Sequence, residues 1–213
     1  MLLLALDTAT PAVTVAVHDG TAVLAARTTV DARRHGELLA PMLAEVMAEA
    51  GATPRDLTDV AVGVGPGPYT GLRIGLVTAR TTAGVVGATL HGVCTLDTIA
   101  AAARRGTPLV VATDARRQEV HWAAYDADGR RTEGPGVDLP AVLAERLPPD
   151  ALLVGRGAEL YADLLPPAEG PLDPDAAVLA QAVVDGVVAV LPVEPLYLRR
   201  PDARPPGPPK PVR

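Results

Sequence analysis

The chain has 213 residues, 48% of them hydrophobic, which argues against general disorder and allows one large domain or two small lobes with a proper core. Its formal charge of −6 excludes the broad basic surface of a protein that grips nucleic acid by itself, although local patches can still contact RNA. Its one cysteine, Cys94, excludes an internal disulfide and a multi-cysteine metal site, and a buried apolar role is expected for it.

The first half of the chain is predicted to alternate strands and helices. The apolar N-terminus carries no basic region and is interrupted by Asp7, so it does not indicate a signal peptide. Strands are expected over 2–6, 13–17, 21–29, 60–64 and 90–93, and helices over 35–50, 72–86 and 96–104. Asp19-Gly20 predicts a hairpin turn, and Gly51 a helix stop.

A glycine-rich loop connects the strand over 60–64 to the helix that follows it. Gly65, Gly67 and Gly71 allow close backbone approach, while Pro66 and Pro68 stiffen the loop. The spacing fits neither a Walker A loop nor a dinucleotide fingerprint. We expect backbone N–H groups aimed at an anion or at a polar group of a partner. A tight structural turn is the alternative.

The second half repeats the opening pattern. Strands are expected over 109–112, 120–125 and 152–154, and helices over 140–146, 158–165 and 176–191. Asp7 and Asp19 are 12 residues apart, as are Asp114 and Asp126. This spacing predicts two similar lobes, 1–105 and 106–200, whose acids Asp7 and Asp114 face each other across a cleft. The proline-rich tail, 201–213, is expected to be disordered or extended on the surface.

Two helices of the first lobe are apolar around more than one side. In the helix that follows His35, seven apolar residues cover more than half the circumference, and Pro41 is expected to start or kink this helix. The two helices therefore indicate either a partner interface or two buried faces inside the lobe. Arg73 and Arg80 are expected at the polar rim of such an interface, or as ordinary solvated charges.

Several motifs together resemble the TsaB (YeaZ) family. They are Asp7-Thr8-Ala9-Thr10, the glycine loop, Asp114-Ala115-Arg116 with Glu119-Val120, and Pro195-Leu196-Tyr197-Leu198-Arg199. The resemblance implies an α/β fold of two duplicated lobes of the actin/Hsp70/sugar-kinase (ASKHA) type. It also implies a cytoplasmic, non-catalytic subunit in the formation of N6-threonylcarbamoyladenosine beside the tRNA anticodon.

The resemblance further implies the partners. They are TsaD in a heterodimer, TsaE with ATP, a second copy when the chain is alone, and tRNA only indirectly, with no membrane. A helix pair in this lobe would form half of a four-helix interface with TsaD. The residues expected at this interface are His35, Leu39, Met42, Leu43, Val46, Met47, Leu72, Arg73, Leu76 and Arg80.

No catalytic residue and no metal site are expected. The related TsaD subunits hold a metal with histidines at i and i+4, but here His35 has Leu39 at that offset. Asp7, Gly65, Gly67 and Gly71 are the candidates for weak nucleotide binding at the partner interface.

Ala9 and Arg116 stand where relatives that bind phosphate carry glycine, so capping of the following turn is the expected role of both acids. A small ASKHA-type ATPase or phosphotransferase that uses Asp7 and Asp114 is the alternative function. A peptidase is a third possibility, against which the absent histidine pair argues.

Overall fold

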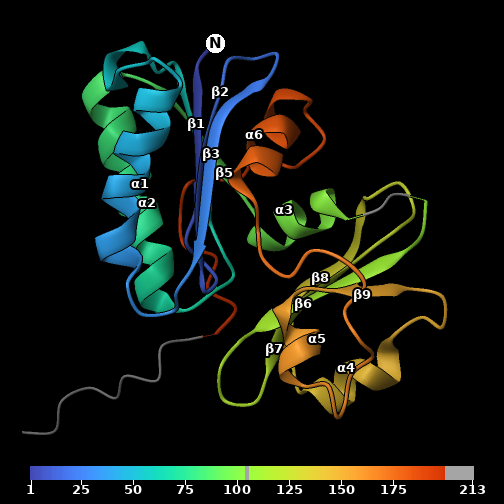
Figure 1. Cartoon of the computed structure of the whole chain (residues 1–213). Coiled ribbons are helices and arrows are strands. Elements are labelled where there is room, and N and C mark those ends of the chain that lie inside the picture. Colours follow the sequence, from blue (N-terminus) through green and yellow to red (C-terminus); the bar gives the residue numbers. More distant parts are fainter. Residues whose placement is uncertain (104–105, 200–213) are drawn as a thin grey trace, which may run out of the picture.

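The computed structural model describes residues 1–103 and 106–199, which form two mixed sheets (Figure 1). The first sheet has five strands in the order β3-β2-β1-β4-β5. Their bounds are Leu3–Asp7 (β1), Ala12–His18 (β2), Val23–Val30 (β3), Asp59–Gly63 (β4) and Thr89–Val93 (β5). Strands β1 and β2 are wholly buried, because they read as continuous apolar runs and helices cover both faces of the sheet.

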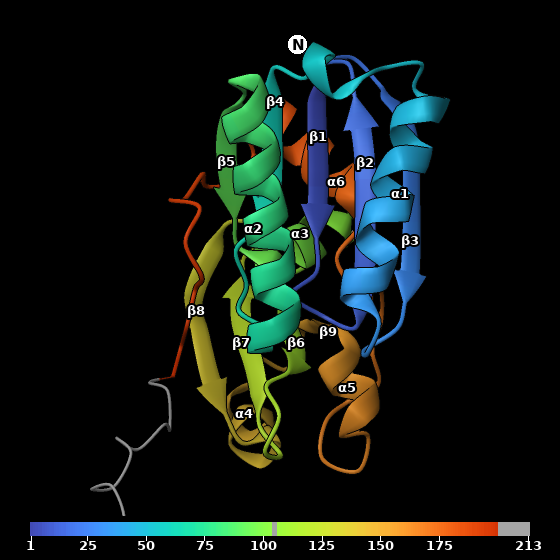
Figure 2. The ribbon, with the colours of Figure 1, turned by 90° about the vertical axis from the view of Figure 1, so that its left-hand side faces the viewer.

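Helices α1 (His35–Glu49) and α2 (Tyr69–Val86) lie side by side on one face of this sheet, and no further helix or strand of the described residues lies over them (Figure 2). Helix α6 (Ala176–Val184) covers the opposite face. A single 3-10 turn, Pro54–Asp56, follows α1. The core between the sheet and the α1–α2 pair is aliphatic, as expected for a chain without phenylalanine.

The second sheet repeats the connectivity of the first. Its order is β8-β7-β6-β9, with bounds Leu109–Asp114 (β6), Val120–Tyr125 (β7), Arg131–Asp138 (β8) and Leu152–Val154 (β9). The pair β1–β2 is antiparallel and β1–β4 parallel, and so are β6–β7 and β6–β9 respectively. Helices α4 (Pro140–Arg146) and α5 (Arg156–Leu160) pack on one face and α3 (Thr95–Ala102) on the other. The predicted α/β duplication is confirmed.

The packing corrects the predicted boundaries of the lobes. Helix α3 was assigned to the first lobe but packs against β6 and β7, and α6 was assigned to the second lobe but packs against β1, β2 and β3. The segment 191–199 also returns to the first lobe, where Leu191 pairs with Gly92 and the Leu196 N–H donates to the Val64 carbonyl at 2.8 Å. Each lobe is therefore completed by chain from the other half.

Several predicted element ends also differ. Helix α6 stops at Val184 rather than 191, because Gly186 adopts a left-handed φ of 65° that helical residues do not share. Helix α5 begins earlier and ends at Leu160. Strand β8 was not predicted, since Gly134, Pro135 and Gly136 conceal it; proline is tolerated on this edge strand.

The structure tests the prediction for Pro41 but not the prediction for the C-terminal tail. Helix α1 runs continuously through the exposed Pro41, which therefore does not start it. The tail 201–213 lies outside the described residues, as does residue 104 at the predicted end of α3. Within 1–103 and 106–199, no helix combines the length and apolarity needed to cross a membrane.

Candidate functional site

Asp7, the last residue of β1, ties three segments together beneath the interlobe cleft. Its side chain is fully buried; Oδ1 accepts the Ala9 N–H at 2.7 Å and Oδ2 accepts the Thr95 hydroxyl at 2.8 Å. The Gly65 N–H in turn donates to the Thr95 oxygen at 3.2 Å. Burial raises the pKa of Asp7 from 3.8 to about 6, although these hydrogen bonds lower it. The expected turn-capping role of Asp7 is confirmed.

The glycine loop packs directly on the segment that follows Asp7. A Cβ on Gly63 would stand 1.9 Å from Asp7 Oδ2, and one on Gly67 would stand 2.0 Å from the Ala9 carbonyl oxygen. A Cβ on Gly71 would stand 2.6 Å from the carbonyl oxygen of Thr8. These glycines therefore serve close backbone approach inside the chain. Nucleotide binding at Asp7, Gly65, Gly67 and Gly71 stays a prediction.

Asp114 holds the equivalent turn of the second lobe. Its Oδ1 accepts the Arg116 N–H at 2.7 Å, as Asp7 accepts that of Ala9, and its Oδ2 pairs with Arg116 Nη1 at 3.2 Å. Three consecutive residues of this turn have left-handed φ values of 55° to 61°; they are Arg116, Arg117 and Gln118. Such values cost a side-chain-bearing residue about 1 kcal/mol or more each. The β6–β7 turn is thus strained where it faces the first lobe.

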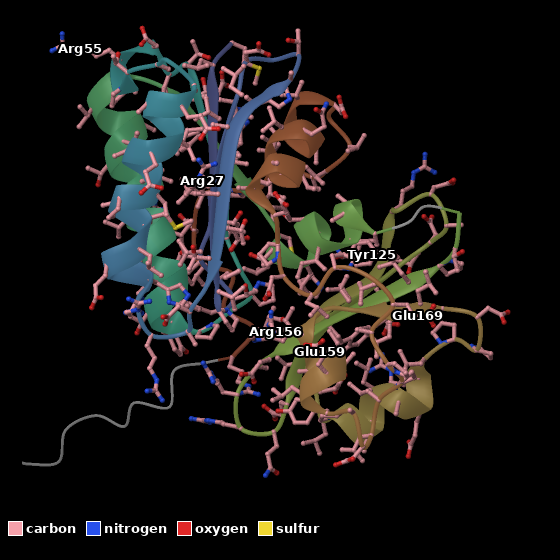
Figure 3. The ribbon with its side chains drawn as sticks, in the orientation of Figure 1. Arg27, Arg55, Tyr125, Arg156, Glu159 and Glu169 are labelled. Carbon is pink, nitrogen blue, oxygen red and sulfur yellow. The ribbon has the colours of Figure 1, made fainter. Side chains whose placement is uncertain are left out.

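The interlobe space at Asp114 is narrow, and the buried Asp7 does not face Asp114 across it as predicted. The space beside Asp114 measures about 10 Å³ and is lined by Arg116, Arg156 and Asp173 among others, while Asp7 does not line it. Arg156 lies at the start of α5 (Figure 3) and is paired with Asp173. Its Nε donates to Asp173 Oδ1 at 3.2 Å. Within the described ranges, no three His, Cys, Asp or Glu side chains gather closely enough to hold a metal ion.

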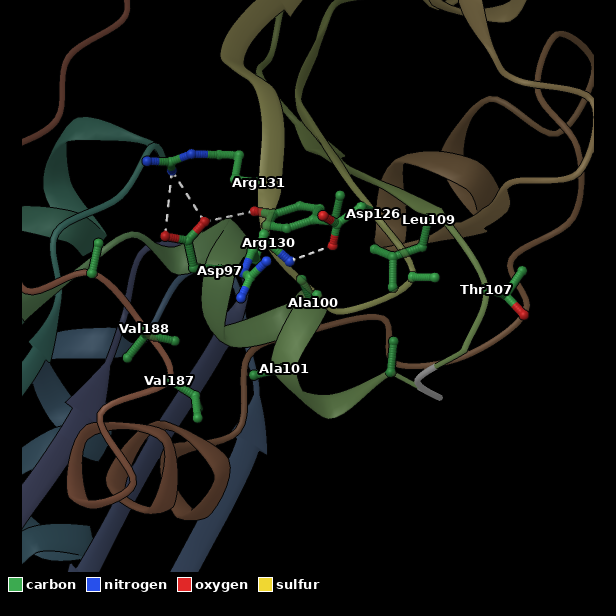
Figure 4. A pocket seen from close by; sticks show the side chains of 15 residues that line it. Asp97, Ala100, Ala101, Thr107, Leu109, Asp126, Arg130, Arg131, Val187 and Val188 are labelled. Carbon is green, nitrogen blue, oxygen red and sulfur yellow. Dashed lines mark hydrogen bonds and ion pairs between the residues drawn. The ribbon is translucent and has the colours of Figure 1, made fainter.

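A separate cavity of about 310 Å³ lies between α3, the β7–β8 turn and residues 187–189 (Figure 4). At its base Asp97 accepts the Tyr125 hydroxyl at 2.7 Å and Arg131 Nη1 at 3.0 Å. Burial raises the pKa of Asp97, and it raises that of the neighbouring Cys94 thiol to about 12. The thiol is therefore protonated and unreactive at neutral pH, and the Asp97 network joins α3 to the second sheet.

Most residues predicted at the partner interface lie instead in the core. Exposures of 0% to 7% place them under the α1–α2 layer, which supports the alternative of buried inner faces; they are Leu39, Met42, Val46, Met47, Leu72 and Leu76. His35 is also buried, with its Nε2 2.8 Å from the Thr10 carbonyl. Leu43 is half-buried. A helix with apolar residues around half its circumference does not reveal from sequence which of them face inward.

The two predicted rim arginines bind the chain's own C-terminal segment. Arg73 Nε donates to the Tyr197 hydroxyl at 2.7 Å, and Arg80 donates to the Val193 carbonyl. They therefore hold residues 193–197 against α2, which sequence reasoning did not anticipate because these partners are more than 100 positions away.

The outer side of α1 and α2 nevertheless carries an apolar groove. It has a volume of about 630 Å³ and lies toward the C-terminal ends of the two helices. Its apolar lining includes Leu43, Met47, Leu57, Val85 and Val86. Of these, Val85 is 81% exposed, and Val77, about two turns earlier on α2, is 62% exposed. They were missed as site residues, although both stand opposite the stripe of Leu72, Leu76, Ala79 and Ala83.

Comparison with known proteins gives a consistent result. The family model described as TsaD, tRNA N6-adenosine threonylcarbamoyltransferase, matches residues 23–167. An uncharacterized protein of Mycobacterium tuberculosis is 45% identical over 205 residues, which cover 95% of this chain and 93% of that protein.

Two further relatives carry a family name. The tRNA threonylcarbamoyladenosine biosynthesis protein TsaB of Escherichia coli is 35% identical, with 93% of this chain and 95% of that protein covered. The solved structure of YeaZ from Pseudomonas aeruginosa matches with a TM-score of 0.78 and 29% identity, covering 92% of this chain and 99% of that one. The expected fold class is confirmed.

Proposed function

Because the chain belongs to the TsaB (YeaZ) family of tRNA threonylcarbamoyladenosine biosynthesis proteins, we propose that it is a non-catalytic subunit that binds a TsaD-type transferase and activates it. The observation that carries this proposal is the apolar groove on the outer side of α1 and α2, with Val85 exposed in its lining and Val77 exposed about two turns earlier on α2. Exposed valines on an uncovered helix pair are costly in water, and a partner surface would remove that cost.

The match to the TsaD family model supports TsaD as the partner. The matched residues 23–167 include α1 and α2, so a TsaD chain is expected to carry a corresponding helix pair. Two such pairs can pack around a pseudo-twofold axis as four helices, burying roughly 1,600 Å² in total. A second copy of this chain offers the same face, so we expect a homodimer when TsaD is absent. TsaE with ATP would join the assembled pair.

The environment of Asp7 supports the non-catalytic assignment. Both carboxylate oxygens are bonded inside the chain, and the side chain has no exposed surface. The alternative ATPase or phosphotransferase would need this acid and Asp114 to reach a metal–nucleotide complex in the cleft. Arg116 stands beside Asp114 in that space, and Ala9 occupies the matching turn of the first lobe.

The test is size-exclusion chromatography with light scattering on the chain mixed with TsaD from the same organism, followed by a tRNA modification assay. We expect a stoichiometric complex, and modification only when both proteins are present. Val85→Glu should keep the isolated chain folded, since Val85 is 81% exposed, but should abolish co-elution and modification. Leu160→Glu, which changes a 54% exposed leucine at the end of α5, is the matched control and should behave as wild type.

Two results would overturn the proposal. Co-elution of the Val85→Glu variant at wild-type strength would remove the α1–α2 face from the interface. Absence of any complex between the wild-type proteins, with or without TsaE and ATP, would reject the subunit role itself. ATP hydrolysis by the chain alone, abolished by Asp114→Asn, would then favour the alternative function.

A further inference from the structure

A second depression lies at the opposite end of α2, where the two lobes meet. It measures about 240 Å³ and is lined by the glycine loop (Gly67 to Tyr69), the β6–β7 turn (Ala115 to Arg117), His121 and residues 196–199. A neighbouring hollow of about 360 Å³, lined by Arg33 and His35 among others, shares Pro68, Tyr69 and Arg116 with it. Tyr69 and Arg116 therefore stand between two adjoining hollows.

An aromatic pair, the exposed Tyr69 and the half-buried Tyr197, lines this depression. Tyr69 is 41% exposed, and the other four aromatic residues of the chain are all more buried. Its ring centroid lies 4.8 Å from that of Tyr197, at an interplanar angle of 46°. The Arg73 guanidinium lies 5.4 Å and 5.7 Å from the two ring centroids. This is a preformed aromatic and cationic surface on which a planar base can stack.

The strained turn supplies the second element of the site. Arg116 has a left-handed conformation that glycine would adopt without strain. Two hydrogen bonds hold it there: the Arg116 N–H donates to the Asp114 carboxylate, and the Glu119 N–H donates to the Arg116 carbonyl. The Arg116 side chain is 59% exposed and lines both hollows. Strain retained in a turn beside a pocket is typical of residues that a ligand requires.

The floor of the depression contains an unpaired polar group. His121 is 8% exposed, and its Nδ1 is buried without a hydrogen-bond partner among the residues that the structure describes. Burial lowers the pKa of this imidazole to about 4, so the ring is neutral at neutral pH. A neutral imidazole offers one donor and one acceptor, as a base edge requires. Because this nitrogen is shielded from solvent, a movement of the ring would have to expose it before a base could pair with it and remove the cost of leaving it unpaired.

We propose that this depression binds an unpaired nucleotide of the RNA substrate, with the base against Tyr69 and above His121 and the flanking phosphates on Arg116 and Arg33. The inference rests on the proposed function, which supplies RNA as the substrate, and it proposes a direct contact where the family resemblance implied only an indirect one. Arg116 lines both hollows and Arg33 lines the second, on a chain whose net charge is −6, so charge complementarity favours a phosphodiester strand over an acidic or neutral surface.

The experiment measures fluorescence anisotropy of a labelled, unmodified anticodon stem-loop RNA, with the chain alone and with TsaD present. Arg116→Gln should weaken binding several-fold and reduce the slope of log affinity against log salt by about 0.7, as expected for one lost phosphate contact on a single strand. Tyr69→Ala should weaken binding by about 5- to 100-fold through lost stacking. Arg55→Gln changes an exposed arginine at the far end of the first lobe (Figure 3) and should leave affinity unchanged.

Three results would overturn the inference. They are wild-type affinity of both Arg116→Gln and Tyr69→Ala, an equal loss in Arg55→Gln, and equal binding of a fully paired RNA of the same length. Displacement of the RNA by ATP at equal concentration would reassign the depression to a free nucleotide.

Co-elution with TsaD is measured for every variant. Unchanged RNA affinity in a variant that still binds TsaD rejects the RNA site but not the subunit role. Failure of the wild-type chain to bind TsaD rejects the subunit role, while the anisotropy of the chain alone still decides the RNA site.

Discussion

The substitution Asp7→Asn tests whether the buried acid at the end of β1 is structural. Burial raises the pKa of Asp7 from 3.8 to about 6 in the folded chain. Protonation is therefore easier in the folded state, so the associated stability is complete below pH 3.8 and is lost as the pH rises through 6. The loss reaches about 3 kcal/mol at pH 8, and roughly half of it is already present at pH 5.

Asparagine keeps the shape of the side chain and its acceptor for the Ala9 N–H, but removes the charge. The Thr95 hydroxyl would lose its carboxylate acceptor, which costs about 1 kcal/mol at every pH. The free energy of unfolding of Asp7→Asn, minus that of wild type, should therefore increase by about 1.4 kcal/mol between pH 5 and pH 8. Pairwise comparison cancels the titration of all other groups.

The assay is urea denaturation followed by circular dichroism at pH 5, 6, 7 and 8. Glu45→Gln, which neutralises an exposed carboxylate of α1, controls for the change in net charge. A stability difference that stays constant or decreases with pH would refute the interpretation of Asp7. Because the proposed function gives Asp7 no part in the chemistry, the variant should also support tRNA modification with TsaD; loss of modification with an intact complex would indicate a direct role for the carboxylate.

Three further outcomes follow from the packing. Gly67→Ala should destabilise the chain by about 1–3 kcal/mol in urea, because its Cβ meets the Ala9 carbonyl, whereas Gly84→Ala, with open space around it, should stabilise α2 by about 0.5–1 kcal/mol; equal effects would contradict the loop geometry. Leu39→Glu should prevent folding, as a charge at a 2% exposed core position does, and a folded variant by circular dichroism would place Leu39 at the surface. Burial lowers the pKa of His121 from 6.5 to about 4. The free energy of unfolding should therefore fall by up to about 3 kcal/mol as the pH drops through this range, because only the unfolded imidazole takes up a proton there. His121→Asn should abolish this loss in acid denaturation.

The sequence predicted the sheets well because their signals are local. The apolar run of β1, the acid that ends it and the tight turn after β2 lie within 20 residues, and the same signals recur from Leu109 onward. Strand β8 escaped because its glycines and proline, which an edge strand tolerates, resemble a loop.

The site was harder to predict, because long-range packing decides it. Which side of α1 faces the sheet depends on β2 and β3, so Leu39 and Val46 could not be told from surface residues by periodicity alone. No local pattern in the sequence indicates that α3 packs against the second sheet and α6 against the first. The left-handed Arg116 was hidden for a different reason, since sequence rules assign that conformation to glycine.

Helix α2 connects the two proposed contacts without merging them. Tyr69 begins the helix at the interlobe depression, and Val85 lies 16 residues later in the lining of the apolar groove, about 24 Å along the axis. A partner seated on the groove would therefore leave the depression open to RNA. Within 1–103 and 106–199 no residue lines both sites, so their energies should be nearly independent. Val85→Ala trims the exposed valine without adding a charge, so it should weaken the TsaD contact without abolishing it. The rate of tRNA modification at limiting RNA and TsaD should accordingly fall in a Val85→Ala and Arg116→Gln double variant by the product of the two single effects. A smaller combined loss would mean that α2 and its N-terminal loop respond to partner and RNA as one unit.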